Sequence, residues 1–157
     1  GREIFESSLE TLAAAGYRHY EISNFALPGF ESKHNQIYWN DGEYIGLGCG
    51  ASSHRQGRRT TNIDRLGEYC DKALARQPPI DSSEKLEGKE KLGETIYLGL
   101  RKLDGLSLTP EMQIQFAAQW SALAGSGLIE RDGARVRLTR DGVFLANDVS
   151  MHFVAPL

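Results

Sequence analysis

YRHYEISNFALPGFESKHNQIYW, residues 17–39, is the stretch that decides the fold. It begins with alternating apolar and polar side chains, which predicts a β-strand over residues 17–23. Residues 2–15 carry apolar side chains at helical spacing and are followed by Gly16, a suitable C-cap, so we expect an amphipathic helix there. A helix, a glycine turn and a strand in succession are typical of an α/β unit with a largely parallel sheet. Functional residues of such units lie just past the end of the strand.

The residues past that strand combine a loop with a short helix. Residues 24–29 contain Pro28-Gly29 and indicate a loop, and Ser32 can act as the N-cap of a helix over residues 34–39. His34 and Tyr38 would share one face of this helix because they are four residues apart.

The same helix brings an imidazole, an amide and two aromatic rings together, in His34, Asn35, Tyr38 and Trp39. Such an imidazole can bind a haem iron axially or face a porphyrin propionate, while the rings pack against the macrocycle. In a purely structural interpretation, His34 and Asn35 cap the loop and the two rings close the end of a barrel. The residues alone leave both interpretations open.

A second glycine-rich stretch follows at residues 44–52, YIGLGCGAS. Its apolar start predicts a strand, with residues 58–62 as a hairpin arm, and its glycines allow another group to approach the backbone. The backbone at Gly48 and Gly50 could face an adenosine or another flat cofactor, or could simply pack closely against a helix. The stretch matches neither the dinucleotide fingerprint nor a P-loop. Cys49 is interpreted as a small buried side chain rather than a reactive thiol or haem ligand.

The second half is predicted to be mainly helical. We expect helices over residues 64–76 and 84–103, followed by a helix that Thr109 caps. The apolar stripe of that third helix consists of Met112, Phe116, Trp120 and Leu123. A hairpin around Asp132-Gly133 and a last helix capped by Thr139 complete the expected elements. This order resembles a winged helix. Residues 84–157 hold nine basic and ten acidic residues, so this half is near neutral and we do not expect it to bind nucleic acid. Docking to another protein remains an alternative.

Composition sets further bounds. The chain has 157 residues, 40% of them hydrophobic, 25% charged, and a net charge of −3, which is ordinary for a globular protein that needs neither metal nor disulfides. No window approaches the roughly 20 apolar residues of a membrane span. Cys49 and Cys70 are 21 positions apart, which matches no metal or disulfide spacing and favours a cytoplasmic location. The chain starts with Gly1 at the edge of a helix, so we expect a fragment of a longer protein.

Residues 17–54 closely resemble the segment that follows the radical-SAM core in haem chaperones of the HemW type. The shared stretches are YRHYEISNFALPGFESKHNQIYW and YIGLGCGASSH, and the specific part is the HNxxYW motif of His34, Asn35, Tyr38 and Trp39. The related oxygen-independent coproporphyrinogen III oxidases share the architecture but usually depart from this motif. TIYLGLRKLDGLS, residues 95–107, is more loosely similar to the family's C-terminal domain.

The resemblance implies a fold that is α/β followed by mainly α. Residues 1–62 would be the C-terminal piece of a partial (β/α) radical-SAM barrel with its exit segment, and residues 63–157 a winged-helix-like C-terminal domain. In this family three cysteines in CxxxCxxC bind a [4Fe-4S] cluster that holds S-adenosylmethionine. The chain lacks that motif, so it holds no catalytic residue and is not expected to be an enzyme by itself.

The resemblance also implies roles for individual residues. Haem or porphyrin would bind at the HNxxYW residues, with His34 as an axial ligand of the iron. S-adenosylmethionine would lie near the backbone or side chains of Asn24, Phe25, Ala26, Gly48 and Gly50.

Two functions of the full-length protein compete. A haem chaperone would bind haem and deliver it to a respiratory haemoprotein. An oxygen-independent coproporphyrinogen III oxidase would oxidatively decarboxylate two propionates to vinyl groups, with the chemistry supplied by the cluster and nucleotide. The exposed sheet edges of half a barrel can also pair with a second copy, so a homodimer is left open.

Overall fold

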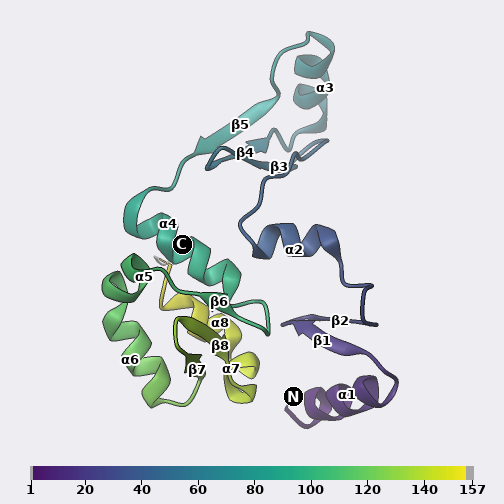
Figure 1. The fold of residues 1–157 in the computed structure, drawn as a ribbon. Coiled ribbons are helices and arrows are strands. Elements are labelled where there is room, and N and C mark those ends of the chain that lie inside the picture. Colours follow the sequence, from purple (N-terminus) through teal and green to yellow (C-terminus); the bar gives the residue numbers. More distant parts are fainter. Residues whose placement is uncertain (1, 155–157) are drawn as a thin grey trace. The chain divides into compact units, whose positions relative to one another are not determined.

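A computed structural model describes residues 2–154 and divides the chain into two compact units (Figure 1). The first unit combines the residues up to Asp41 with those from Lys89 onward. The second consists of Gly42–Gly88. The domain boundary expected after residue 62 concerns the barrel of a longer protein, and it remains a prediction.

The first unit begins with the expected helix and strand. Helix α1 (Arg2–Ala14) ends at Gly16, whose φ of 83° and whose N–H bond to the Ala13 carbonyl close the last turn. Strand β1 (Arg18–Glu21) then pairs antiparallel with β2 (Asn24–Ala26). The expected loop over residues 24–29 is therefore wrong for its first half. Pairing with β1 extends the backbone of residues 24–26, and only the part with Pro28-Gly29 remains a loop.

Strand β1 is also bound along its other edge by the segment that follows α4 (Gly88–Gly99). The Ile22 N–H donates to the Arg101 carbonyl at 3.0 Å, and the Leu103 N–H donates to the Tyr20 carbonyl at 3.2 Å. These bonds place Glu21 opposite Lys102 in an antiparallel bridge. The strand pairs of the described residues are all antiparallel, so the parallel sheet expected around residues 17–23 is not seen within residues 2–154.

The remaining part of the first unit has the expected winged-helix order. After α4 its elements are β6 (Leu106–Ser107), α5 (Pro110–Gln115), α6 (Ala117–Gly125), β7 (Ile129–Asp132), β8 (Arg135–Leu138), α7 (Arg140–Phe144) and α8 (Ala146–Met151). The hydroxyls of Thr109 and Thr139 accept the N–H groups of Met112 and Gly142, as expected of N-caps. Strand β6 was not expected, because its two residues carry no detectable alternation. It pairs with β8, whose other neighbour is β7.

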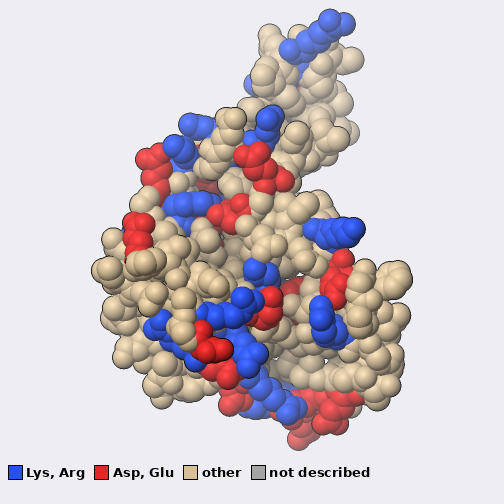
Figure 2. Space-filling model, viewed as in Figure 1, with Lys and Arg blue, Asp and Glu red and all other residues tan. Residues whose placement is uncertain are grey.

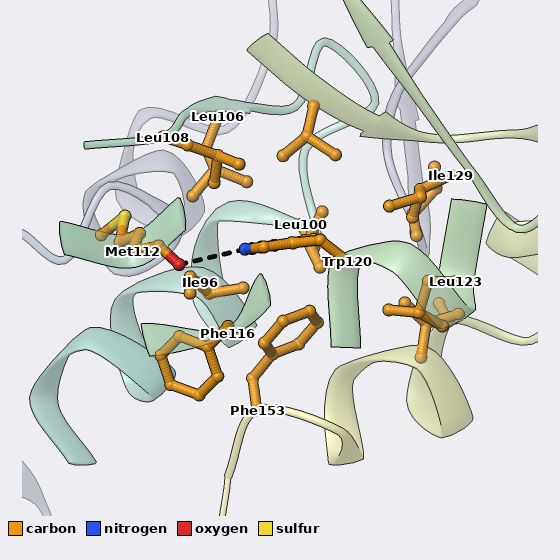
Figure 3. Packing of buried hydrophobic residues seen from close by; sticks show 14 residues of the cluster. Ile96, Leu100, Leu106, Leu108, Met112, Phe116, Trp120, Leu123, Ile129 and Phe153 are labelled. Atoms are coloured by element: carbon orange, nitrogen blue, oxygen red, sulfur yellow. Dashed lines mark hydrogen bonds between the residues drawn. The ribbon is translucent and has the colours of Figure 1, made fainter. Parts of the chain in front are cut away.

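The apolar core lies in this winged-helix part (Figure 3). The Trp120 side chain lies among Met112, Phe116 and Phe153, and its indole N–H donates to the Met112 carbonyl at 3.1 Å. The predicted stripe of Met112, Phe116, Trp120 and Leu123 is fully buried, although the helix breaks between α5 and α6 at Phe116, where φ is −119°. A core of this kind holds α4 and its following segment in a defined position.

The second unit is a small sheet with one helix. Strands β3 (Ser52–Arg55), β4 (Arg58–Asn62) and β5 (Ile80–Glu84) form a sheet in that order, and α3 (Leu66–Leu74) connects the last two. The strand expected at the apolar start of residues 44–52 is not formed, since residues 44–51 are a loop in which only Tyr44 bridges to His54. The helix expected from residue 84 begins later, because the exposed polar sequence IDSSE forms β5.

Candidate functional site

The HNxxYW residues lie on a short helix, α2 (Lys33–Trp39). Ser32 caps it as expected, since its hydroxyl accepts the Asn35 N–H at 3.2 Å. His34 is exposed, and the Tyr38 hydroxyl lies 2.9 Å from its Nε2 atom. The two rings meet edge to face, with centroids 4.8 Å apart. The expected shared face of His34 and Tyr38 is confirmed.

Trp39 anchors α2 to the segment that follows α4. The guanidinium carbon of Arg101 lies 4.4 Å from the centroid of the Trp39 ring, a cation–π contact. One residue further on, the Lys102 ammonium donates to the Asn40 side-chain carbonyl at 2.6 Å. The motif therefore divides into a pair of an exposed imidazole with a half-buried phenol and a tryptophan that binds α2 to the segment after α4.

The anchor leaves two polar atoms without hydrogen bonds. Trp39 Nε1 and Arg101 Nε are buried and have no partner among the described residues. Both atoms belong to the stacked pair, so the cation–π contact is their main compensation for lost water. Sequence reasoning placed Trp39 against a ligand or a barrel end, and it did not single out Arg101 within the stretch of residues 95–107.

Apolar side chains near His34 are left exposed. Phe30, which precedes the cap of α2, is 80% exposed, and Ile37 on α2 itself is 40% exposed. Leu27 is also exposed. An imidazole flanked along the chain by exposed apolar side chains suits a ligand that offers both a metal and a flat apolar surface.

The residues expected near S-adenosylmethionine in the first unit all have structural partners. The Asn24 side-chain amide donates to the Glu21 carboxylate, which is fully buried and also accepts the Ser23 N–H at 3.1 Å. Phe25 stacks on His19 with centroids 4.3 Å apart, and Ala26 is buried. Glu21 was not predicted as a site residue, and the signal for its burial was a charge between Tyr20 and Ile22 in a strand.

A polar cavity of about 400 Å³ lies on the tryptophan side of α2. Glu21, Trp39 and Lys102 line it, together with the ion pair of Arg18 and Glu31. His34 and Tyr38 are not among its lining residues. The pair of His34 and Tyr38 and this cavity are therefore separate features of the first unit.

Gly48 and Gly50 belong to the second unit, in the loop before β3. Both have positive φ, 106° and 69°, which favours glycine. The Gly50 N–H donates to the Ile63 carbonyl, and the Gly48 carbonyl accepts the Asn62 side-chain amide at 2.9 Å. The neighbouring Cys49 is only partly buried, and its thiol donates to the Asp64 carbonyl at 2.8 Å. These bonds give the loop a fixed path.

The residues present do not fit an iron–sulfur cluster. Cys49 and Cys70 are both free, and residues 2–154 contain no group of three or more His, Cys, Asp or Glu side chains able to hold a metal. A cluster with one open iron needs three thiolates. We also find no helix in the described part of the chain with the length and apolarity needed to cross a membrane.

The chain is similar in sequence to one family model and to several proteins of known function. Residues 86–145 match the family model of the HemN C-terminal domain. The chain is 37% identical over 97% of its length to the haem chaperone HemW of Lactococcus lactis subsp. lactis, of which it covers 41%. It is 34% identical over 99% of its length to the HemW of Bacillus subtilis, of which it covers 43%. The chain therefore spans less than half the length of these relatives.

A solved structure shares the fold. Coproporphyrinogen III oxidase (HemN) from Escherichia coli, a radical SAM enzyme, superposes with a TM-score of 0.76 over 98% of this chain and 41% of its own, at 20% identity. Residues 86–145 thus match the HemN C-terminal domain, and the chain shares its fold with HemN. Over nearly its whole length it is a homologue of the HemW haem chaperones. The resemblance drawn from residues 17–54, and the fold class that it implied, are confirmed.

Proposed function

We propose that this chain is the C-terminal part of a haem chaperone, and that the full-length protein binds haem at α2 and passes it to a respiratory haemoprotein. The observation that carries the proposal is the exposed His34 on a helix anchored by its other face. An anchored helix holds the imidazole in a fixed direction without burying it. The relatives of highest overall similarity named above are haem chaperones, which supports the same function.

In this proposal each part of α2 has one task. His34 supplies the axial nitrogen, and Phe30 and Ile37 contribute apolar surface beside the macrocycle. Trp39, through Arg101, keeps the helix in place. Haem is the cargo in this proposal, so a site that is open to solvent is suitable for its transfer.

The roles of S-adenosylmethionine and the cluster belong to the full-length protein. Cluster ligands would come from residues outside this chain. We propose that Asn24, Phe25 and Ala26 support the S-adenosylmethionine pocket by shaping β2, and that Gly48 and Gly50 offer backbone to the nucleotide. A cytoplasmic location is proposed with them. The oxidase function is the second candidate, and its support is the fold shared with HemN at 20% identity.

Haem titration followed by visible absorption tests the proposal. We expect the full-length protein to bind haem stoichiometrically with a shifted Soret band, and His34→Ala to lose that shift because the axial nitrogen is removed. His152→Ala is the matched control, since it removes another exposed imidazole of the first unit and should bind haem normally. Haem binding that is unchanged in His34→Ala, or absent from the wild type, would rule out His34 as the ligand and favour the oxidase.

A further inference from the structure

The two nitrogens of His34 are not equally accessible to a haem iron. Nδ1 lies beside the Cβ atom, so the side chain itself crowds a macrocycle that approaches this nitrogen. Nε2 lies on the far side of the ring and is the atom that an iron can reach. The two nitrogens differ in their partners as well, because each hydrogen bond engages one nitrogen only.

Nε2 is the nitrogen that Tyr38 contacts. The Tyr38 hydroxyl lies 2.9 Å from it, whereas no hydrogen bond joins Nδ1 to any residue of the described part of the chain. The spacing of four residues on one helix places the hydroxyl within reach of the imidazole. When the hydroxyl donates to Nε2, it occupies the lone pair that would bind iron.

We propose that Tyr38 is a positioning residue that competes with haem iron for His34 Nε2 and so makes the bound haem easy to release. The inference rests on the proposed function and adds a device for transfer to it. Haem can bind only when the Tyr38 hydroxyl leaves Nε2, and the hydroxyl is ready to return when haem departs. The haem-free state thus has a satisfied imidazole, which lowers affinity in the way that any stabilised unbound state does.

The size of the effect follows from the strength of one hydrogen bond. A single neutral hydrogen bond contributes little net free energy in water, so its loss should change haem affinity about two- to tenfold rather than by orders of magnitude. The rest of the site is unaffected, because Trp39 and Arg101 hold α2 from its other face. A weak competitor of this kind suits a protein that must give its ligand up.

Tyr38→Phe removes the hydroxyl and keeps the ring. In the full-length protein titrated with haemin, we expect this variant to bind about two- to tenfold more tightly than the wild type, at an unchanged Soret position. Tyr17→Phe, which removes the hydroxyl of an exposed tyrosine outside the site, should leave the affinity unaltered. Equal or weaker binding by Tyr38→Phe would overturn the proposal, and so would a shifted Soret band, which would indicate iron bound to the Tyr38 oxygen in the wild type.

A measurement without haem tests the pair itself. The ¹⁵N chemical shift of His34 Nε2 in the haem-free protein should change in Tyr38→Phe and stay constant in Tyr17→Phe. An unchanged shift would mean that the hydroxyl does not engage Nε2, and the proposal would fall. These results separate the two levels of inference: haem binding that is independent of His34 removes the proposed function, whereas His34-dependent binding with an indifferent Tyr38→Phe removes only the role of Tyr38.

Discussion

Lys91 is the residue through which the end of α2 is tied to α4 by charge. Its ammonium lies 2.7 Å from the Asp41 carboxylate and 2.8 Å from that of Glu94, and the Thr95 hydroxyl also donates to Asp41. Burial by itself lowers the pKa of Lys91, but the hydrogen bonds and charges of the two carboxylates outweigh it, and the pKa is raised above its ordinary value. The charged form is therefore the one that the fold stabilises.

We predict that Lys91→Met destabilises the protein by about 1–3 kcal/mol, because two poorly exposed carboxylates lose their shared cation. Chemical unfolding in urea gives the difference. Since the folded-state pKa is raised, the contribution is fully present below the ordinary lysine pKa of 10.5 and is lost only as pH rises through the folded value. The difference between wild type and variant should thus be the same at neutral and mildly alkaline pH.

Lys85→Met is the control for Lys91→Met. Lys85 pairs with Glu87 at 2.7 Å, but its side chain is 47% exposed, and exposed ion pairs contribute little. We expect a change within about 0.5 kcal/mol. An equal decrease in the free energy of unfolding in the two variants would show that the ion pair between Lys91 and Asp41 stabilises the protein no more than an exposed ion pair does.

At the scale of elements, helices can pack closely on other backbone segments where a glycine leaves room. Gly93 lies in α4, and a Cβ atom there would be 2.0 Å from the Phe153 carbonyl oxygen. Gly125 ends α6, and a Cβ atom there would meet nothing within 4 Å. Both glycines are helical, so helix propensity favours alanine at each, and only packing distinguishes them.

Gly93→Ala should therefore destabilise the protein by about 1–3 kcal/mol, since the backbone after α8 must move away from α4. Gly125→Ala should be neutral or stabilising by up to about 1 kcal/mol. Thermal unfolding of the two variants beside the wild type measures both effects. A Gly93→Ala variant as stable as Gly125→Ala would show that the contact between α4 and the chain near Phe153 is loose.

At the scale of the whole molecule, the distribution of charge and of cysteine limits what the chain can do alone. Basic and acidic side chains are interspersed on the face shown in Figure 2. The arginines of the wing form exposed ion pairs, Arg135 with Asp104 and Arg137 with Glu130. Both cysteines lie in the second unit, and neither has a thiol neighbour to share a metal.

We predict that the purified chain, after incubation with iron and sulfide, neither retains a [4Fe-4S] cluster nor cleaves S-adenosylmethionine. Three thiolates are needed for such a cluster, and the chain has two cysteines. Visible absorption and detection of 5′-deoxyadenosine measure the two outcomes. The full-length protein under the same conditions is the positive control, and any turnover by the chain itself would contradict the cysteine argument.

Local signals in the sequence were the reliable ones. The caps at Ser32, Thr109 and Thr139 and the turn at Asp132-Gly133 occur as expected, because each depends on a few neighbouring residues. The short strands β2, β5 and β6 were missed or misplaced. A strand of two to five residues is stabilised by its partner rather than by its own composition, so its own residues reveal little.

The sequence by itself determined the family, the winged-helix order and the shared face of His34 and Tyr38, because periodicity, caps and motifs depend on residues close along the chain. Only the tertiary structure decided that Trp39 packs on Arg101, that Glu21 is buried between two neighbours of β1, and that Asp41 meets Lys91. The contacts of Trp39 with Arg101 and of Asp41 with Lys91 join residues 50 or more positions apart along the chain. Such pairing of distant segments follows from the packed core and not from any local sequence pattern.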